Sequence, residues 1–138
     1  MNPRSRQALL WVAILAVGGL VVRRVPLHLP AVVSKYGGSM LWGAMVYAVF
    51  VAVLPRRRSV EVGVAAGGFA LTVELFKLVH APGLDAFRMT LAGQLLIGRV
   101  FSFADLLAYG VAIAAFAAVD NAKLSRTNLR SELWSDKR

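Results

Sequence analysis

The seventeen residues Gly38–Leu54, GSMLWGAMVYAVFVAVL, decide the fold class of this chain. They contain no charged side chain, and the nearest charges on either side are Lys35 and Arg56, with 20 residues between them. A helix needs about 20 mostly apolar residues to cross the hydrocarbon core of a bilayer. The stretch therefore predicts a helix that spans a membrane.

Three further stretches, at about 7–22, 60–79 and 103–119, are also long and apolar enough to cross a bilayer. The first has basic residues before an apolar run, as a signal peptide does, but Arg23 and Arg24 follow directly and no small-residue cleavage site precedes them. We therefore expect an all-α polytopic membrane protein with four spans. A single membrane domain would cover residues 1–119, and a charged cytoplasmic tail would cover 120–138.

The composition of the whole chain supports this prediction. Of its 138 residues, 58% are apolar and 17% are charged, whereas a soluble domain is about a quarter charged. The absence of cysteine excludes a disulfide framework, thiolate metal sites and a cysteine nucleophile. The two histidines, His28 and His80, are too few for a histidine metal site. The sequence predicts neither a metal nor a cofactor.

The distribution of basic residues predicts the orientation of the spans, because Lys and Arg accumulate on the cytoplasmic side. With four spans, ten of the 16 basic residues fall on the side of the termini: Arg4, Arg6, Arg56, Arg57, Arg58, Lys123, Arg126, Arg130, Lys137 and Arg138. The other six are Arg23, Arg24, Lys35, Lys77, Arg88 and Arg99. Both termini are thus expected in the cytoplasm. The net charge of +9 then reflects topology and attraction to anionic lipid, and no nucleic-acid-binding motif is present.

The connections between the spans carry their own predictions. Residues 23–35 are apolar and interrupted by Pro26 and Pro30, so we expect a segment at the outer interface with His28 as an interfacial histidine. Ser59 is expected to N-cap the third span. Residues 85–100 are too short and too polar to span, and they predict one interfacial or re-entrant helix.

Most polar side chains near the membrane converge on the outer leaflet. Glu74 lies about 21 Å along the third span, at 1.5 Å per residue, and Lys77 follows at i+3. Asp105 begins the fourth span, and Tyr109 shares its face at i+4. We expect Glu74 to pair with Lys77 or Arg88, and Asp105 to pair with Arg99 or Arg88. The cluster is either an ionic lock or a ligand site, since buried charges need partners in both cases.

For the ligand reading, the candidate binding residues are Arg88, Glu74, Asp105, Arg99, Lys77, Tyr109 and Gln94. Arg88 and Arg99 would share one face of the helix at 85–100. Arg88 is expected to lack an acidic partner and to contact an anionic headgroup, with Gln94 as a weaker candidate for the same ligand. Arg99 is expected to be mainly structural.

Three functions remain open at this point. The first is a non-enzymatic envelope protein that binds an anionic lipid or cell-wall-precursor headgroup, or serves a membrane-protein partner. The second is a membrane-embedded enzyme on a lipid-linked substrate with Glu74 or Asp105 as general base. No HExxH or GxSxG motif supplies its nucleophile or metal. The third is a small transporter, which would have to oligomerise. Gly63 and Gly67 form a GxxxG motif that favours helix packing or a homo-oligomer.

Three segments carry a family resemblance: 35–42 with 46–47, 74–82 followed by Arg88, and 101–110. Over about residues 20–119 the chain resembles an uncharacterised bacterial membrane family, DUF2809, which is itself similar to the VanZ-like proteins. The resemblance implies a four-span protein of the bacterial inner membrane. VanZ-like proteins are linked in name to glycopeptide-antibiotic tolerance, without an agreed chemistry. The chain departs from the family pattern at Ser39, Lys77 and near Gly83, where aspartate, glutamine and tryptophan are usual.

Overall fold

The computed structural model describes the backbone of residues 1–25 and 30–135, and the side chains of these residues except 23–24 and 128–135. The interfacial histidine predicted at position 28 lies outside the described residues, as do the last two basic residues of the tail, Lys137 and Arg138.

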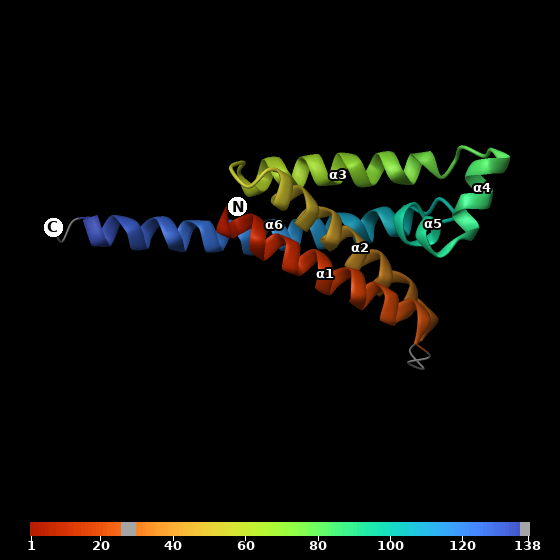
Figure 1. Ribbon diagram of the computed structural model, residues 1–138, viewed down its shortest axis with the longest axis horizontal. Coiled ribbons are helices and arrows are strands. Elements are labelled where there is room, and N and C mark those ends of the chain that lie inside the picture. The colour runs from red at the N-terminus through yellow and green to blue at the C-terminus, as the bar shows by residue number, and fades with distance from the viewer. Residues whose placement is uncertain (26–29, 136–138) are drawn as a thin grey trace.

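The described chain is helical throughout, as expected. Its elements are α1 (Pro3–Arg24), α2 (Ala31–Val53), α3 (Ser59–Phe76), α4 (Pro82–Met89), α5 (Leu91–Leu96) and α6 (Phe103–Ser135) (Figure 1). Four of them contain candidate membrane spans: Pro3–Val22, Ala31–Val53, Ser59–Phe76 and Phe103–Thr127. These four spans indicate a multi-pass membrane protein and confirm the predicted fold class.

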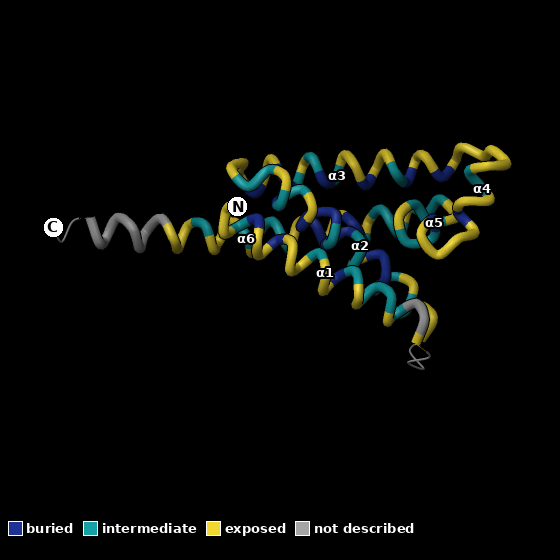
Figure 2. Tube along the Cα trace, in the orientation of Figure 1, coloured by how far each residue is buried: buried dark blue, intermediate teal, exposed yellow. Residues whose placement is uncertain are grey.

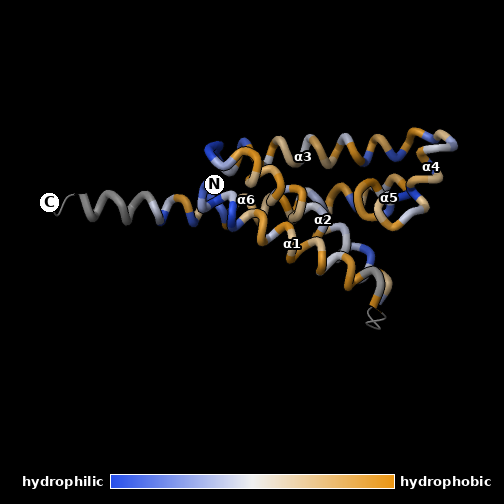
Figure 3. Tube along the Cα trace, viewed as in Figure 1, coloured by the Kyte–Doolittle hydropathy of each residue, from blue (hydrophilic) through white to orange (hydrophobic). Residues whose placement is uncertain are grey.

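The surface of the bundle is apolar along these four helices. Many large hydrophobic side chains are exposed, among them Leu10, Val64 and Leu107. Figures 2 and 3 show that exposed positions along α1 and α3 are largely hydrophobic. In water such a surface would favour aggregation, whereas in a bilayer the acyl chains of lipids cover it.

Helices α2 and α6 form the centre of the bundle. Helix α2 packs against α1, α3 and α6, and α6 also packs against α3. The crossing of α2 and α6 requires a glycine at position 43, because a Cβ there would lie 2.8 Å from Tyr109 Cα. Of the predicted GxxxG pair, Gly63 faces Ala117 on α6, while Gly67 has open space beside it. Small residues thus allow close helix packing, as is usual in membranes.

Three helices are longer than predicted: α1 by a few residues at each end, and α2 and α6 by more. Helix α2 begins at Ala31, so Lys35 belongs to the span itself and not to an interfacial segment. Helix α6 passes the expected boundary between residues 119 and 120 without a break and reaches Ser135. At 1.5 Å per residue its 33 residues extend for about 50 Å, so its C-terminal part projects beyond the other helices (Figure 1).

The segment between α3 and α6 is helical, but the prediction of one continuous helix over 85–100 was wrong. The chain forms α4 and α5, with a break at Thr90, where ψ is 159° and the side chain caps α5 by accepting from Gly93 N. The corner is tight, because a Cβ on Gly93 would lie 2.0 Å from Phe87 O. Arg88 ends up on α4 and Arg99 beyond α5, so they share no helix face.

Candidate functional site

The end of α3 holds a buried ion pair. Lys77 Nζ lies 2.6 Å from Glu74 Oε2, and the two side chains are 4% and 0% exposed. The other oxygen of Glu74 accepts a hydrogen bond of 2.6 Å from the backbone N–H of Ser102. This confirms the predicted pairing of Glu74 and shows that Lys77, one turn along the same helix, is its partner. Glu74 also anchors the chain just before α6.

The loop between α5 and α6 closes over Lys77. Gly98 has a φ of +80°, and a Cβ there would lie 3.0 Å from Lys77 Cε. Only glycine adopts this left-handed conformation without strain. Lys77 Nζ also donates to Tyr109 OH over 3.4 Å. The ammonium group is therefore held between α3, the α5–α6 loop and α6.

Arg88, which was expected to contact a ligand, is bonded to other groups of the protein. Its side chain is 3% exposed, and it donates to the carbonyls of Val79 and Phe76 at 2.8 and 2.7 Å and to Asp85 Oδ1 at 3.0 Å. The prediction that Arg88 lacks an acidic partner was wrong, because Asp85 lies one turn earlier on the same helix, α4. The guanidinium satisfies carbonyls that the last turn of a helix leaves unpaired.

Asp105 is also partnered differently from the prediction. No ion pair with Arg88 or Arg99 forms among the described residues. Instead, Asp105 Oδ1 accepts a hydrogen bond of 2.8 Å from Ser39 Oγ on α2. Because α6 begins at Phe103, the carboxylate lies in its first turn, where the helix dipole favours a negative charge. The bond joins the start of α6 to the second span.

These side chains border a cavity of about 350 Å³ at the α5 end of the bundle. Five of the seven predicted site residues line it: Lys77, Gln94, Arg99, Asp105 and Tyr109. Glu74 lies behind Lys77, and Arg88 is not among the lining residues. The wall also includes Lys35, Trp42 and Ser102, which lie in the segments of the family resemblance but were not among the predicted binding residues.

The cavity has an excess of positive charge. Three of its lining residues are cationic, Lys35, Lys77 and Arg99, and one is acidic, Asp105. Glu74 neutralises Lys77. Lys35 and Arg99 are exposed, and neither has a carboxylate within 4 Å in the described part of the chain. Asp105 accepts a hydrogen bond from Ser39 and keeps its negative charge, so three cations against the two carboxylates of Glu74 and Asp105 leave a net charge of +1 at the cavity. The aromatic rings of Trp42 and Tyr109, with centroids 4.7 Å apart, complete the wall.

A second, partly buried cluster lies around Asp120, which the sequence indicated only as the start of the tail. Arg4 forms a bidentate ion pair with it, with Nη2–Oδ2 and Nε–Oδ1 distances of 2.5 and 3.3 Å. Asp120 Oδ2 also accepts from Tyr47 OH at 2.9 Å and from Ser59 Oγ at 2.8 Å. Ser59 therefore bonds to α6, and Arg58 holds the N-cap position of α3 that was predicted for Ser59.

The Asp120 cluster places both ends of the membrane domain on one side. Arg4 Nη1 also donates to the carbonyls of Pro55 and Arg57 in the α2–α3 turn, at 2.8 and 2.7 Å. The N-terminus, this turn and the middle of α6 therefore meet, while α4 and α5 lie at the opposite end (Figure 1). Which side of the membrane holds the termini stays a prediction. Arg4 and Asp120 are 116 residues apart in the sequence. The sequence feature that could have indicated their pairing is that one charge precedes the first predicted span and the opposite charge follows the fourth.

Comparison with known families adds one finding. A family model described as a protein of unknown function, DUF2809, matches residues 28–113. The chain belongs to the DUF2809 family. The match runs from just before α2 to the first third of α6 and includes the lining of the cavity, but it excludes Arg4 and Asp120. No solved structure matches this chain. The similarity to VanZ-like proteins stays a prediction.

Proposed function

We propose that this DUF2809 protein binds the phosphate-bearing headgroup of an anionic envelope lipid or cell-wall precursor. The observation that carries the proposal is the cavity with two exposed cations, Lys35 and Arg99, that have no carboxylate partner among the described residues. A guanidinium fork suits a phosphate and is less hydrated than an ammonium group. Charges that remain unpaired beside a membrane usually face a ligand or water.

The proposal assigns different roles to the two arginines from those expected. Arg99 replaces Arg88 as the main ligand contact, because all the acceptors of Arg88 lie within the protein. Lys77, Gln94 and Tyr109 supply walls and secondary contacts, and Glu74 positions Lys77. With the basic residues around the termini on the cytoplasmic side, the cavity would open toward the outer leaflet of a bacterial inner membrane. An accessory role beside a partner protein or in a homo-oligomer is compatible with this site.

Lipid retention in native mass spectrometry tests the proposal. The detergent-solubilised protein is loaded with phosphatidylglycerol, with a polyprenyl phosphate, or with zwitterionic phosphatidylcholine as reference. We expect Arg99→Gln to lower retention of the anionic lipids about fivefold, the equivalent of about 1 kcal/mol for one partly exposed charged contact. Preference for the polyprenyl phosphate would indicate a cell-wall precursor, and preference for phosphatidylglycerol a phospholipid.

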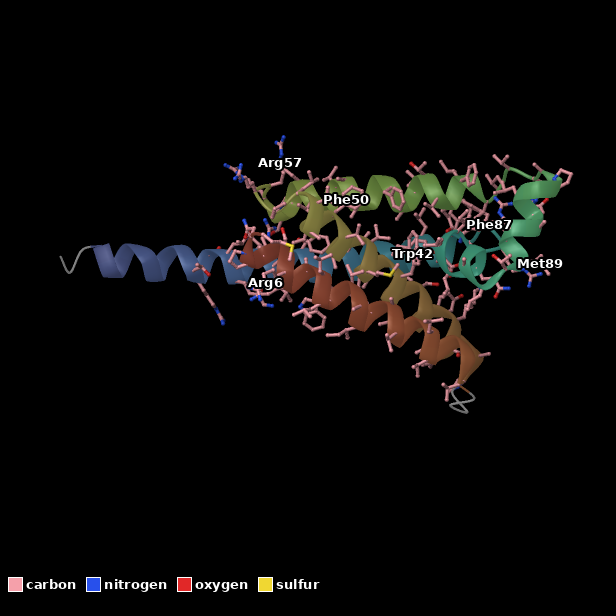
Figure 4. The ribbon with its side chains drawn as sticks, in the orientation of Figure 1. Arg6, Trp42, Phe50, Arg57, Phe87 and Met89 are labelled. Carbon is pink, nitrogen blue, oxygen red and sulfur yellow. The ribbon has the colours of Figure 1, made fainter. Side chains whose placement is uncertain are left out.

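Arg6→Gln is the matched control, because Arg6 is exposed on α1 at the far end of the bundle (Figure 4). It removes the same charge without touching the cavity. Equal losses from Arg6→Gln and Arg99→Gln would mean that lipid follows the net charge of the protein, and the headgroup site would be refuted. Unchanged retention in Arg99→Gln would refute it as well.

A second candidate function is an enzyme that acts on a lipid-linked substrate. The observation that favours it is the hydrogen bond from Ser39 Oγ to Asp105 Oδ1, a hydroxyl beside a possible general base. Against it, Ser39 is only 5% exposed and is not among the residues that line the cavity. If Ser39→Ala abolishes turnover of a polyprenyl phosphate or diphosphate while lipid retention persists, the enzyme is favoured over the binding protein.

A further inference from the structure

A second, apolar groove lies beside the charged cavity. Its volume is about 300 Å³, and it is lined by Leu15, Ala16, Gly19, Leu20, Gly38, Trp42, Met45, Ala92, Leu95 and Leu96. None of these residues is charged. The groove lies between the outer halves of α1 and α2 and the short helix α5. It is therefore continuous with the part of the molecule that faces the hydrocarbon core.

The groove exists because α1 and α5 do not pack against each other. Among the described residues, the backbone of α1 is in contact with α2, and that of α5 with α4. Small residues on the facing helices, Gly19 on α1 and Ala92 on α5, leave the space between them open. A Cβ on Gly19 would meet no atom within 4 Å.

The groove and the charged cavity share two lining residues, Trp42 and Leu95. These side chains form a common wall, with cations on one side and aliphatic side chains on the other. Trp42 extends from α2 in the half of the bundle that carries α5 (Figure 4), and its ring packs on Tyr109. Tryptophan is suited to such a boundary, because it has a large apolar ring and a polar N–H.

We infer that the groove holds one hydrocarbon chain of the same lipid molecule whose anionic headgroup occupies the cavity. This inference rests on the proposed function, and it makes that function more specific. The ligand must be an amphiphile with a phosphate-type headgroup and a long chain, so a soluble phosphate ester would bind only weakly. The charge of the cavity, the apolar lining of the groove and their shared wall favour this occupant over a peptide or a second copy of the chain.

The groove can be filled without disturbing the cavity by Gly19→Leu. Its matched control is Gly68→Leu on α3, where a Cβ also meets nothing within 4 Å and the position is exposed. Retention of long-chain phosphatidylglycerol and of its dihexanoyl analogue is measured by native mass spectrometry. We expect Gly19→Leu to lower retention of the long-chain lipid by about threefold and to leave the short-chain lipid unchanged. The effect is expected to be modest because a lipid chain gains no hydrophobic free energy when it moves from the bilayer into the groove. Only better van der Waals packing favours the groove.

The outcomes separate the two proposals. If Gly19→Leu and Gly68→Leu retain the long-chain lipid equally, the groove holds no chain, while the headgroup site stands. If Gly19→Leu lowers retention of both lipids equally, the inference about the chain is also overturned. If Arg99→Gln changes retention of neither lipid, the headgroup site itself fails.

A measurement on the unmodified protein guards against a variant that folds poorly. Phosphatidylglycerol with a diazirine near the end of one acyl chain is photolysed in the complex, and the labelled peptides are identified. We expect label in residues 15–20 and 92–96. Label confined to the exposed face of α3 would overturn the inference, because that face lies away from the groove.

Discussion

The two ionic clusters, around Asp120 and Lys77, lie at opposite ends of the bundle and differ in how completely their charges are partnered. Around Asp120, both carboxylate oxygens are bonded by Arg4, and one also accepts from Tyr47 and Ser59. The remaining guanidinium nitrogen bonds to backbone carbonyls. The Lys77 cluster has an equally well-bonded pair at its back. A cavity borders each cluster: the one beside Asp120 is about 180 Å³ and has one cation without an acidic partner among the described residues, Lys123, whereas the larger one beside Lys77 has two, Lys35 and Arg99.

This difference separates a structural role from a binding role. A fully connected polar network specifies one arrangement of the helices that contribute to it, and the Asp120 cluster joins α1, α2, α3 and α6. A cavity with cations that lack acidic partners can accept an anion. Burial of charge alone does not distinguish these roles. What distinguishes them is whether donors remain for a ligand after the protein has bonded its own groups.

The largest effect on stability is expected in the cluster around Asp120. Asp120→Ala leaves Arg4 without its carboxylate and Tyr47 and Ser59 without their acceptor. The pair is only partly buried, with side chains 13% and 18% exposed, but the loss of the whole network should bring the cost to about 3–5 kcal/mol, which is typical of breaking a buried pair. We expect a loss of that size in the free energy of unfolding, measured as thermal unfolding in detergent. Glu61→Ala is the control, because its pair with Arg57 is exposed and should contribute less than about 1 kcal/mol. Similar losses in both variants would contradict a structural role for the Asp120 cluster.

A smaller effect is expected at the back of the cavity. Glu74→Gln leaves the ammonium group of Lys77 buried without its acid, at a cost of about 3 kcal/mol. Lys77 lines the cavity, so water there can offset part of the loss. The double variant with Lys77→Met should lose less stability than the sum of the two single variants. Strictly additive losses in detergent melts would show that the pair is not coupled.

The smallest effects compare the two arginines. Arg88→Gln removes bonds to the carbonyls at the end of α3 and should cost about 2 kcal/mol. Arg99→Gln should change stability by less than about 0.5 kcal/mol, because the side chain is exposed and has no acidic partner among the described residues. The test is to compare the thermal unfolding of the two variants in the same detergent. A larger loss in Arg99→Gln than in Arg88→Gln would reverse the roles assigned here.

Several features of the fold and site could be predicted because they depend on neighbouring residues. Hydropathy over about 20 residues predicted the four spans. The pair of Glu74 and Lys77 followed from the i+3 geometry of a single helix. Five of the seven predicted site residues line the cavity, because the ends of α3 and α6 and the segment that joins them lie at the same end of the bundle.

Other contacts could not be predicted, since they depend on where distant helices cross. The partner of Asp105 is Ser39, 66 residues away, because α6 starts against α2. The internal contacts of Arg88 were not predicted, because the break at Thr90 placed it on a separate helix from Arg99. The Asp120 cluster was missed because its four side chains come from four different helices.

The amino-acid sequence by itself determined that this chain is helical, that it has four apolar spans and that Glu74 has a basic neighbour within one turn. Those properties follow from hydropathy and helix periodicity, which act over a few turns of one helix. Only the tertiary structure decided which charges are neutralised and which remain on a cavity wall. The reason is that ion pairs act over about 4 Å, a distance that helix crossings set and that residue spacing along the chain does not encode.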